Sequence, residues 1–236
     1  MKIGPGWPYY GRPVPGGPAP GPDDLPALRA RQRALGVPEA LEWIHELRPG
    51  LLAIARRAGL RVREAPLMVL GGGRFRSPEP PAGVRVRLLG ADDPALPGLG
   101  AVQHIGFADP GTEVGTAGPA ERDASPAGRS PVELEFLGDR IRRGLTVPAV
   151  AEDGDGVLAC GSHQPVGDVS AIVGIATLPS ARRRGLAALV TGRLVQDARA
   201  RGVELIFLEA EDAGVARIYA RLGFERVATA CIAGAA

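Results

Sequence analysis

A run of three arginines followed by glycine stands where a helix is predicted to begin, and cations placed there suit phosphate binding. The residues are Arg182-Arg183-Arg184-Gly185, followed by Leu186 and Ala187. The first turn of a helix carries partial positive charge and unpaired N–H groups, and glycine lets the backbone approach a ligand closely. The pattern therefore predicts that this turn binds a phosphate or diphosphate. A solvated run of surface charges is the alternative interpretation of the arginine side chains.

The sequence on either side of this turn has the periodicity first of a strand and then of a helix. Residues 169–177 are nearly all apolar or small, which is typical of a buried central strand. Apolar residues then recur at helical spacing over residues 186–201. A P-loop would require Gly-Lys-Ser or Gly-Lys-Thr and a dinucleotide site GxGxxG, and the chain has neither motif. The turn therefore indicates another class of phosphate ligand.

The chain as a whole divides into four predicted segments. They are a Pro/Gly-rich tail (1–22), a helical region ending in a strand (23–70), a linker (71–83) and a larger domain (84–236). In the helical region we expect helices at DDLPALRARQRALG, VPEALEWIHELRPG and PGLLAIARRAGL, and a strand at LRVREAPLMVL. No internal repeat is expected.

The larger domain is predicted to be a mixed α/β fold. We expect a strand over 84–89, a helix at LPGLGAVQHIGFA, a polar loop over 108–129 and a helix that begins with a Ser130–Glu133 capping box. Three strands follow, at TVPAVAE, GVLACGS and DVSAIVGIAT, with a turn over His163–Asp168. After the helix at 186–201, the strand VELIFLEAE, the helix AGVARIYARLG and the strand ERVATACIA complete the chain.

Composition argues against several classes of protein. A net charge of +2 with interspersed signs gives no reason to expect a nucleic-acid partner, and no apolar run approaches the roughly 20 residues that span a membrane. Cys160 and Cys231 lie far apart without metal-ligand spacing, so we expect reduced thiols, no metal and a cytoplasmic protein. Lys2 is the only lysine and asparagine is absent, which indicates a GC-rich bacterial genome.

Two motifs together resemble those of the GNAT N-acetyltransferase family. Arg182–Ala187 fits the pattern R/Q-x-x-G-x-G/A, and IYARLGF at 218–224 matches a second family landmark one strand later. The resemblance covers residues 84–236 and leaves the N-terminal third unexplained. It implies a mixed, mostly antiparallel central sheet of the GNAT type with flanking helices, preceded here by a small helical N-terminal extension. It also implies acetyl-CoA as the co-substrate.

The resemblance carries particular roles for the residues around the turn. Backbone amides would hold the coenzyme A pyrophosphate, and these belong to Arg182, Arg183, Arg184, Gly185, Leu186, Ala187 and Ala188. Arg182 occupies the cationic position of the motif and is the first of the three arginines that we expect to contact phosphate. The main chain of Ile175, Ala176 and Thr177 would bind the pantetheine arm where their strand diverges from VELIFLEAE. Asp212, at a position where relatives commonly have asparagine, would lie near that arm.

The same resemblance suggests catalytic groups. Tyr219 matches a tyrosine that protonates the departing thiolate, and a phenol with an ordinary pKa near 10 carries that proton at neutral pH. A core position on its helix is the alternative role for Tyr219. Glu209 is our first choice of general base, with Glu211, His104 and His163 as further candidates. The strand containing Ala171 and Val173 lacks the glutamate that some members use, so a water relay is also open.

The predicted function is transfer of an acetyl group from acetyl-CoA to an amine of a small molecule or peptide, by direct transfer in a ternary complex. A coenzyme-A-binding regulatory or sensor protein without turnover is the alternative, and nucleic-acid binding through the arginines is a weaker one. Only residues 225–236 follow LGF, where many members have two strands. The missing edge strand would come from a partner subunit, as in a homodimer, or from APLMVL of the N-terminal region.

Overall fold

The computed structural model describes residues 10–14, 16–72 and 75–234. Their strands form one open, mostly antiparallel sheet of eight, in the order β1-β8-β2-β7-β6-β5-β4-β3. The predicted mixed α/β class with flanking helices is confirmed. The described chain divides into two compact units: residues up to 68 with 209–212 and those from 226 onward, and Val69–Leu208 with Ala213–Glu225. We describe each unit by itself.

The second unit contains the predicted antiparallel strands and one parallel pair. β3 (Arg85–Leu88), β4 (Val147–Asp153), β5 (Gly156–Val166) and β6 (Val169–Thr177) pair antiparallel in chain order. β7 (Leu205–Glu209) then runs parallel to β6, with Ile172 opposite Leu208. The parallel step is possible because a helix connects the two strands.

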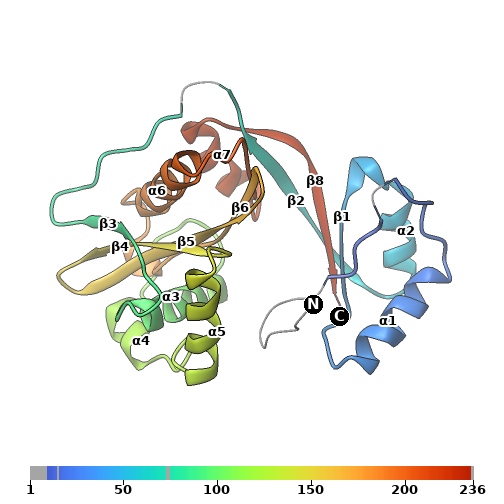
Figure 1. Cartoon of the computed structure of the whole chain (residues 1–236), viewed down its shortest axis with the longest axis horizontal. Helices are drawn as coiled ribbons and strands as arrows, with labels where there is room; N and C mark the ends of the chain where they lie inside the picture. The colour runs from blue at the N-terminus through green and yellow to red at the C-terminus, as the bar shows by residue number, and fades with distance from the viewer. Residues whose placement is uncertain (1–9, 15, 73–74, 235–236) are drawn as a thin grey trace. The chain divides into compact units, whose positions relative to one another are not determined.

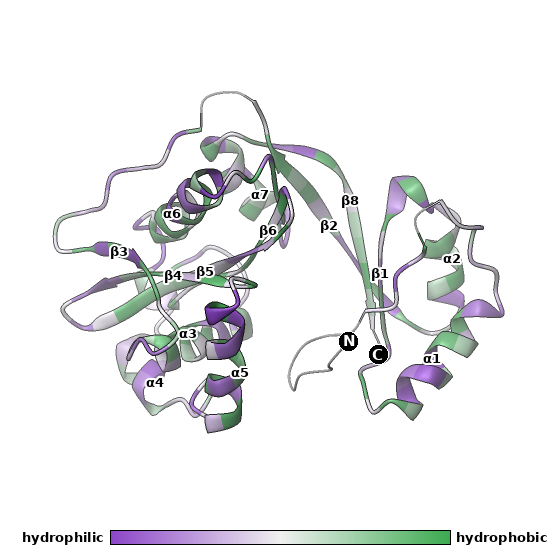
Figure 2. Ribbon diagram, viewed as in Figure 1, coloured by the Kyte–Doolittle hydropathy of each residue, from purple (hydrophilic) through white to green (hydrophobic). Residues whose placement is uncertain are grey.

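Helices cover both faces of this part of the sheet. α6 (Leu186–Ala200) packs on β4, β5 and β6, while α3 (Leu96–Ala108) packs on β5 and β6 from the other side (Figure 1). α4 (Pro119–Ala124) and α5 (Pro131–Arg142) follow α3, and α7 (Ala213–Leu222) packs beside α6. α6 shows both colours in Figure 2, as expected of a helix with one buried face.

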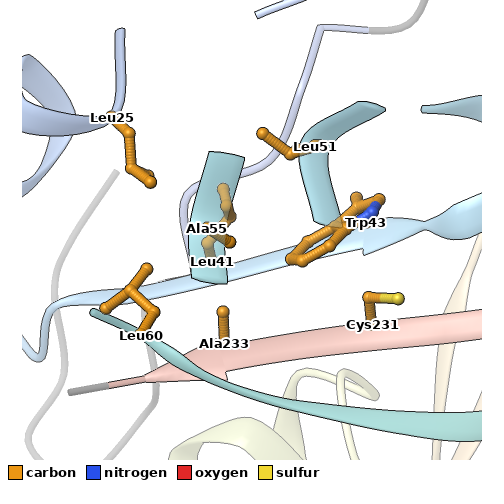
Figure 3. Packing of buried hydrophobic residues seen from close by; sticks show 8 residues of the cluster. All are labelled: Leu25, Leu41, Trp43, Leu51, Ala55, Leu60, Cys231 and Ala233. Carbon is orange, nitrogen blue, oxygen red and sulfur yellow. The ribbon is translucent and has the colours of Figure 1, made fainter. Parts of the chain in front are cut away.

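The first unit has its own hydrophobic core. α1 (Asp24–Ala34) and α2 (Gly50–Arg57) cover β1 (Ala40–Ile44) and β8 (Phe224–Gly234), which pair antiparallel, and β2 (Arg61–Leu70) follows α2. Figure 3 shows Leu41 and Trp43 of β1 beside Cys231 and Ala233 of β8, under the helices. Alternate residues of each strand therefore point into one core.

One predicted helix of this region is wrong. VPEALEWIHELRPG forms β1 and then a short 3₁₀ turn, η1 (His45–Leu47), rather than a helix. Leu41 and Trp43 alternate with partly exposed neighbours, and β1 pairs with β8 in register Trp43↔Cys231. Pairing with a strand nearly 200 residues away in the sequence overrides the helical propensity of Ala, Leu and Glu here.

Three local predictions in the second unit also need correction. The 108–129 loop contains α4, whose Arg122 is buried and donates to the carbonyls of Val157 and Asp155. Ser130 does precede α5, but its side chain makes no capping hydrogen bond. His163 lies inside β5 rather than in the following turn, because that strand continues to Val166.

The N-terminal region contributes β2 to the sheet. β2 stands between β8 and β7 in the sheet order, so APLMVL fills the position that the sequence left open, as one of the two alternatives predicted. The order helix, strand, helix, strand also occurs twice, as α1-β1-α2-β2 and α6-β7-α7-β8. Both copies have glycines of positive φ after their two helices: Gly36 and Gly59, Gly202 and Gly223.

Candidate functional site

The turn before α6 has an unusual backbone. A 3₁₀ turn, η2 (Pro179–Ala181), leads to Arg182, which is extended, and then to Arg183, which has a φ of 66°. Arg183 is the one non-glycine residue in the described chain with a positive φ, and Gly185 follows with a φ of 77°. Left-handed residues between other conformations turn successive amides toward one side, which is how short backbone segments form anion sites.

The first turn of α6 continues this amide surface. The Leu189 amide donates to the Gly185 carbonyl at 3.1 Å, and it is the first in the helix to reach such an acceptor. Leu186, Ala187 and Ala188 precede it, so their amides have no carbonyl within the helix to which they can donate. The positive end of a 15-residue helix dipole acts at the same place. Together these features suit a diphosphate.

The three arginines of the turn have different surroundings. Arg182 has a side chain only 8% exposed, and its guanidinium donates to the main-chain carbonyls of Gly106 in α3 and of Glu113 in the loop after α3. Arg184 reaches Asp153 at 3.6 Å, and Arg183 is exposed. The cation expected first at phosphate is therefore directed toward protein, whereas its two neighbours lie at the surface.

The edge of β6 diverges from β7 beyond one residue pair. Parallel pairing ends at Ile172↔Leu208, but β6 continues to Thr177 and remains paired with β5 on its other side. Gly174 has a φ of 65°, and the register with β5 shifts between Cys160 and Ser162. Among the described residues, the edge of β6 toward β7 at Ile175–Thr177 therefore has no strand partner.

Tyr219 lies on the buried side of α7. Its ring is 6% exposed and packs edge-on against Phe224, with centroids 6.1 Å apart. The aromatic contact fixes the ring, since edge-to-face pairs are favourable. Asp212 immediately precedes the helix, so its charge lies near the helix N-terminus.

Glu209 lies in the first unit and has a perturbed carboxyl. Burial, together with the charge and hydrogen bond of Glu42, raises the pKa of Glu209 to about 7. Arg12 donates through Nε to the Glu42 carboxylate at 2.8 Å, and the charges of Arg12 and Arg63 oppose the rise. A carboxyl with such a pKa exchanges protons readily at neutral pH, as a general base must. Glu42 was missed by sequence reasoning, because nothing local connects β1 with β7.

The other candidate bases have surroundings that do not suit the role. His163 is fully buried, with Nδ1 2.9 Å from Ser170 Oγ and Nε2 3.0 Å from Asp197 Oδ2. This Ser-His-Asp arrangement has no exposed serine, so it holds β5, β6 and α6 together. His104 and Glu211 are exposed. Cys160 and Cys231 are free and buried.

Neither a metal site nor a membrane span is present in the described part of the chain. No three His, Cys, Asp or Glu side chains gather in a way that would hold a metal ion, within residues 10–14, 16–72 and 75–234. No helix in the same part of the chain is long and apolar enough to cross a bilayer.

Comparison with known proteins places these features in a family. The model of the acetyltransferase (GNAT) family matches residues 119–224, which include the turn and α7. A mycothiol acetyltransferase from Beutenbergia cavernae is 32% identical over 212 residues, covering 85% of this chain and 68% of that protein.

Solved structures agree with the fold. A GCN5-related N-acetyltransferase from Kribbella flavida superposes with a TM-score of 0.63 at 27% identity, covering 91% of this chain and 74% of its own. A GCN5-related N-acetyltransferase from Sphaerobacter thermophilus gives a TM-score of 0.59 at 19% identity, over 86% of this chain and 62% of its own. The second likeness bears on the fold alone.

Proposed function

Because the chain belongs to the GNAT acetyltransferase family, we propose that it transfers an acetyl group from acetyl-CoA to the amine of a small molecule. The observation that carries this proposal is the turn at 182–188, where left-handed residues 183 and 185 lead into an unpaired helix N-terminus. The free β6 edge at Ile175–Thr177 supports it, since main-chain groups there suit an amide-containing arm.

Binding would use main-chain groups far more than side chains. The amides of the turn would hold the pyrophosphate, and exposed Arg183 and half-exposed Arg184 would add positive charge. A Cβ at Gly185 would meet nothing within 4 Å, so the space beside this residue is open to a ligand. The residues present therefore fit the co-substrate.

The chemical step needs one group to accept a proton and another to donate one. The amine attacks the thioester carbonyl carbon in its neutral form, and we assign the proton that its nitrogen loses on becoming an amide to the Glu209 carboxylate, whose pKa is raised to about 7. The new C–N bond forms, the C–S bond breaks, and the Tyr219 hydroxyl gives its proton to the departing sulfur. The phenol is recovered by proton exchange with solvent.

The acceptor class is suggested by the relative. The Beutenbergia cavernae protein is named as a mycothiol acetyltransferase, so a mycothiol-related small molecule is our first acceptor, and peptide amines come second.

The test follows free thiol after the protein is mixed with acetyl-CoA and an amine panel. We expect amine-dependent thiol release that falls about 100-fold or more in Tyr219→Phe, because the proton donor is lost while the ring packing stays. Tyr219→Phe should bind coenzyme A as the wild type does. Coenzyme A binding without release across the panel would instead support a sensor, and no binding at all would refute the proposal.

A further inference from the structure

The Arg182 side chain joins the turn at residues 182–188 to the segment that precedes it in the fold, through several main-chain carbonyls. Its guanidinium donates to the carbonyls of Glu113 at 3.1 Å and Gly106 at 3.2 Å, and also to that of Asp109. The Asp109 carboxylate lies 3.7 Å away. These partners span the end of α3 and the 109–118 loop, which connects α3 with α4.

The backbone just before Arg182 is joined to the same loop. Gly115 donates its amide to the Pro179 carbonyl at 3.1 Å, and Ser180 donates to the Ala117 carbonyl at 3.0 Å. The approach is close enough to require glycine. A Cβ at Gly115 would lie 2.7 Å from Pro179 Cβ, and one at Gly118 would lie 2.6 Å from Ser180 Oγ.

The far end of the loop is fixed independently. Glu121 accepts a hydrogen bond from the Gly118 amide at 2.7 Å, and buried Arg122 attaches α4 to the β4–β5 turn. The 109–118 loop is therefore attached to α4 at Gly118. It is attached to residues 179–182 through Asp109, Glu113, Gly115 and Ala117. Without Arg182, the latter attachment would consist of the two backbone hydrogen bonds.

We propose that Arg182 is a positioning residue that couples coenzyme A binding at the turn to the order of the 109–118 loop, rather than a side chain that contacts phosphate. Its backbone is part of the amide surface, whereas its guanidinium donates to the carbonyls of Asp109 and Glu113 in the loop and of Gly106 in α3. An anion that fixes the turn therefore fixes the loop, and by reciprocity an ordered loop favours anion binding. This inference goes beyond the proposed function, since it concerns the unbound protein as well.

The arginine fork is essential to this role. A guanidinium has five N–H donors in one plane and can hold three carbonyls together, whereas an ammonium is a compact point charge. Arg182→Lys therefore keeps the charge at the turn but loses the fork, and Arg182→Gln loses both. Arg184→Gln is the matched control, because it removes one charge from the same turn and has no contact with the loop.

Hydrogen exchange of peptides covering 106–118 tests the coupling, with and without coenzyme A. In the free protein we expect exchange there to become about tenfold faster in Arg182→Lys and Arg182→Gln and to stay unchanged in Arg184→Gln. Coenzyme A should protect 106–118 in the wild type and in Arg184→Gln, but much less in the two Arg182 variants. Peptides of β4 and β5 serve as the folding control.

Titration calorimetry measures the affinity of each variant for coenzyme A and gives the second readout. If Arg182 only supplies charge, Arg182→Lys should behave as the wild type in exchange, and Arg182→Gln should lose affinity without a change at 106–118. Either result would overturn the proposal. If the wild type fails to bind coenzyme A, the proposed function and the coupling to this ligand both fail, whereas faster exchange of residues 106–118 in the free Arg182→Lys protein would separately show that the guanidinium orders the loop.

Discussion

His163 Nε2 lies 3.0 Å from Asp197 Oδ2, so a fully buried imidazole of β5 is joined to a carboxylate of α6. The other ring nitrogen is 2.9 Å from Ser170 Oγ on β6. Three elements of the second unit are thus connected through one side chain, and two of them, β6 and α6, flank the turn at residues 182–188. Burial lowers the pKa of His163, although the hydrogen bond and charge of Asp197 act in the opposite direction.

This relationship predicts lower stability in acid. A histidine whose folded-state pKa lies below its unfolded value of about 6.5 stabilises the fold above that pH, and the contribution is lost as the pH falls. We expect the Tm to drop between about pH 7 and about pH 5, measured by calorimetry. His163→Gln should have a lower Tm at neutral pH and a flatter profile. An equally steep profile in this variant would assign the acid sensitivity to other groups.

The surroundings of Glu209 predict that two substitutions, at Glu42 and at Arg12, shift the pH dependence of activity in opposite directions. Glu42 raises the pKa of Glu209 and Arg12 lowers it, so removing either should move the acid limb of kcat/KM. Glu42→Gln should shift the limb to lower pH, because a neighbouring negative charge is gone. Arg12→Gln should shift it to higher pH. Shifts in the same direction, or none, would remove Glu209 from the role of base.

Direct loss of the base gives a separate prediction. Glu209→Gln keeps the size of the side chain but cannot accept a proton, so kcat should fall about 100-fold or more while coenzyme A affinity is unchanged. Glu211→Gln is the control, because Glu211 is exposed and two residues away. If both variants lose activity equally, the water relay becomes the better account.

Gly185 and Gly59 form a matched pair for testing the turn. Their φ values are 77° and 76°, and a Cβ on either would meet nothing within 4 Å. Each Gly→Ala change should therefore cost about 1–2 kcal/mol of unfolding free energy through backbone strain alone. Only Gly185→Ala should also weaken coenzyme A binding, measured by calorimetry. Equal affinity in both variants would show that the turn does not contact the ligand.

Two substitutions of Trp43, in the core of the first unit, should differ in their effect on the free energy of unfolding. Its indole Nε1 is buried and has no hydrogen-bond partner among the described residues. Trp43→Phe should cost less than about 1.5 kcal/mol, because an unpaired donor disappears with part of the packing. Trp43→Ala should cost about 3–5 kcal/mol, measured by urea unfolding. Equal costs would mean that the N–H has a partner after all.

The parts of the site that sequence reasoning found are those set by neighbouring residues. The strand at 169–177, the turn with Arg183 and Gly185, and α6 follow one another along the chain, so local periodicity predicts them. The divergence of β6 from β7 followed from the family resemblance and is seen in their pairing.

The parts that it missed depend on pairing between distant segments. The composition of β1 predicts a helix, and the segment is a strand because it pairs with β8. His163, Ser170 and Asp197 meet because β5 extends beyond its predicted end. Glu42 and Glu209 come together across most of the chain, and no spacing rule connects them.

The pairing of β1 with β8 has a consequence for synthesis of the protein. β1 is made before β8, so Leu41 and Trp43 are synthesised long before Cys231 and Ala233, the residues of β8 that close the core over them. Until then Leu41, Trp43 and the apolar sides of α1 and α2 lack their covering strand. Contacts of such long sequence separation form slowly, so a ribosome-bound chain would expose this surface to chaperones until β8 has been synthesised.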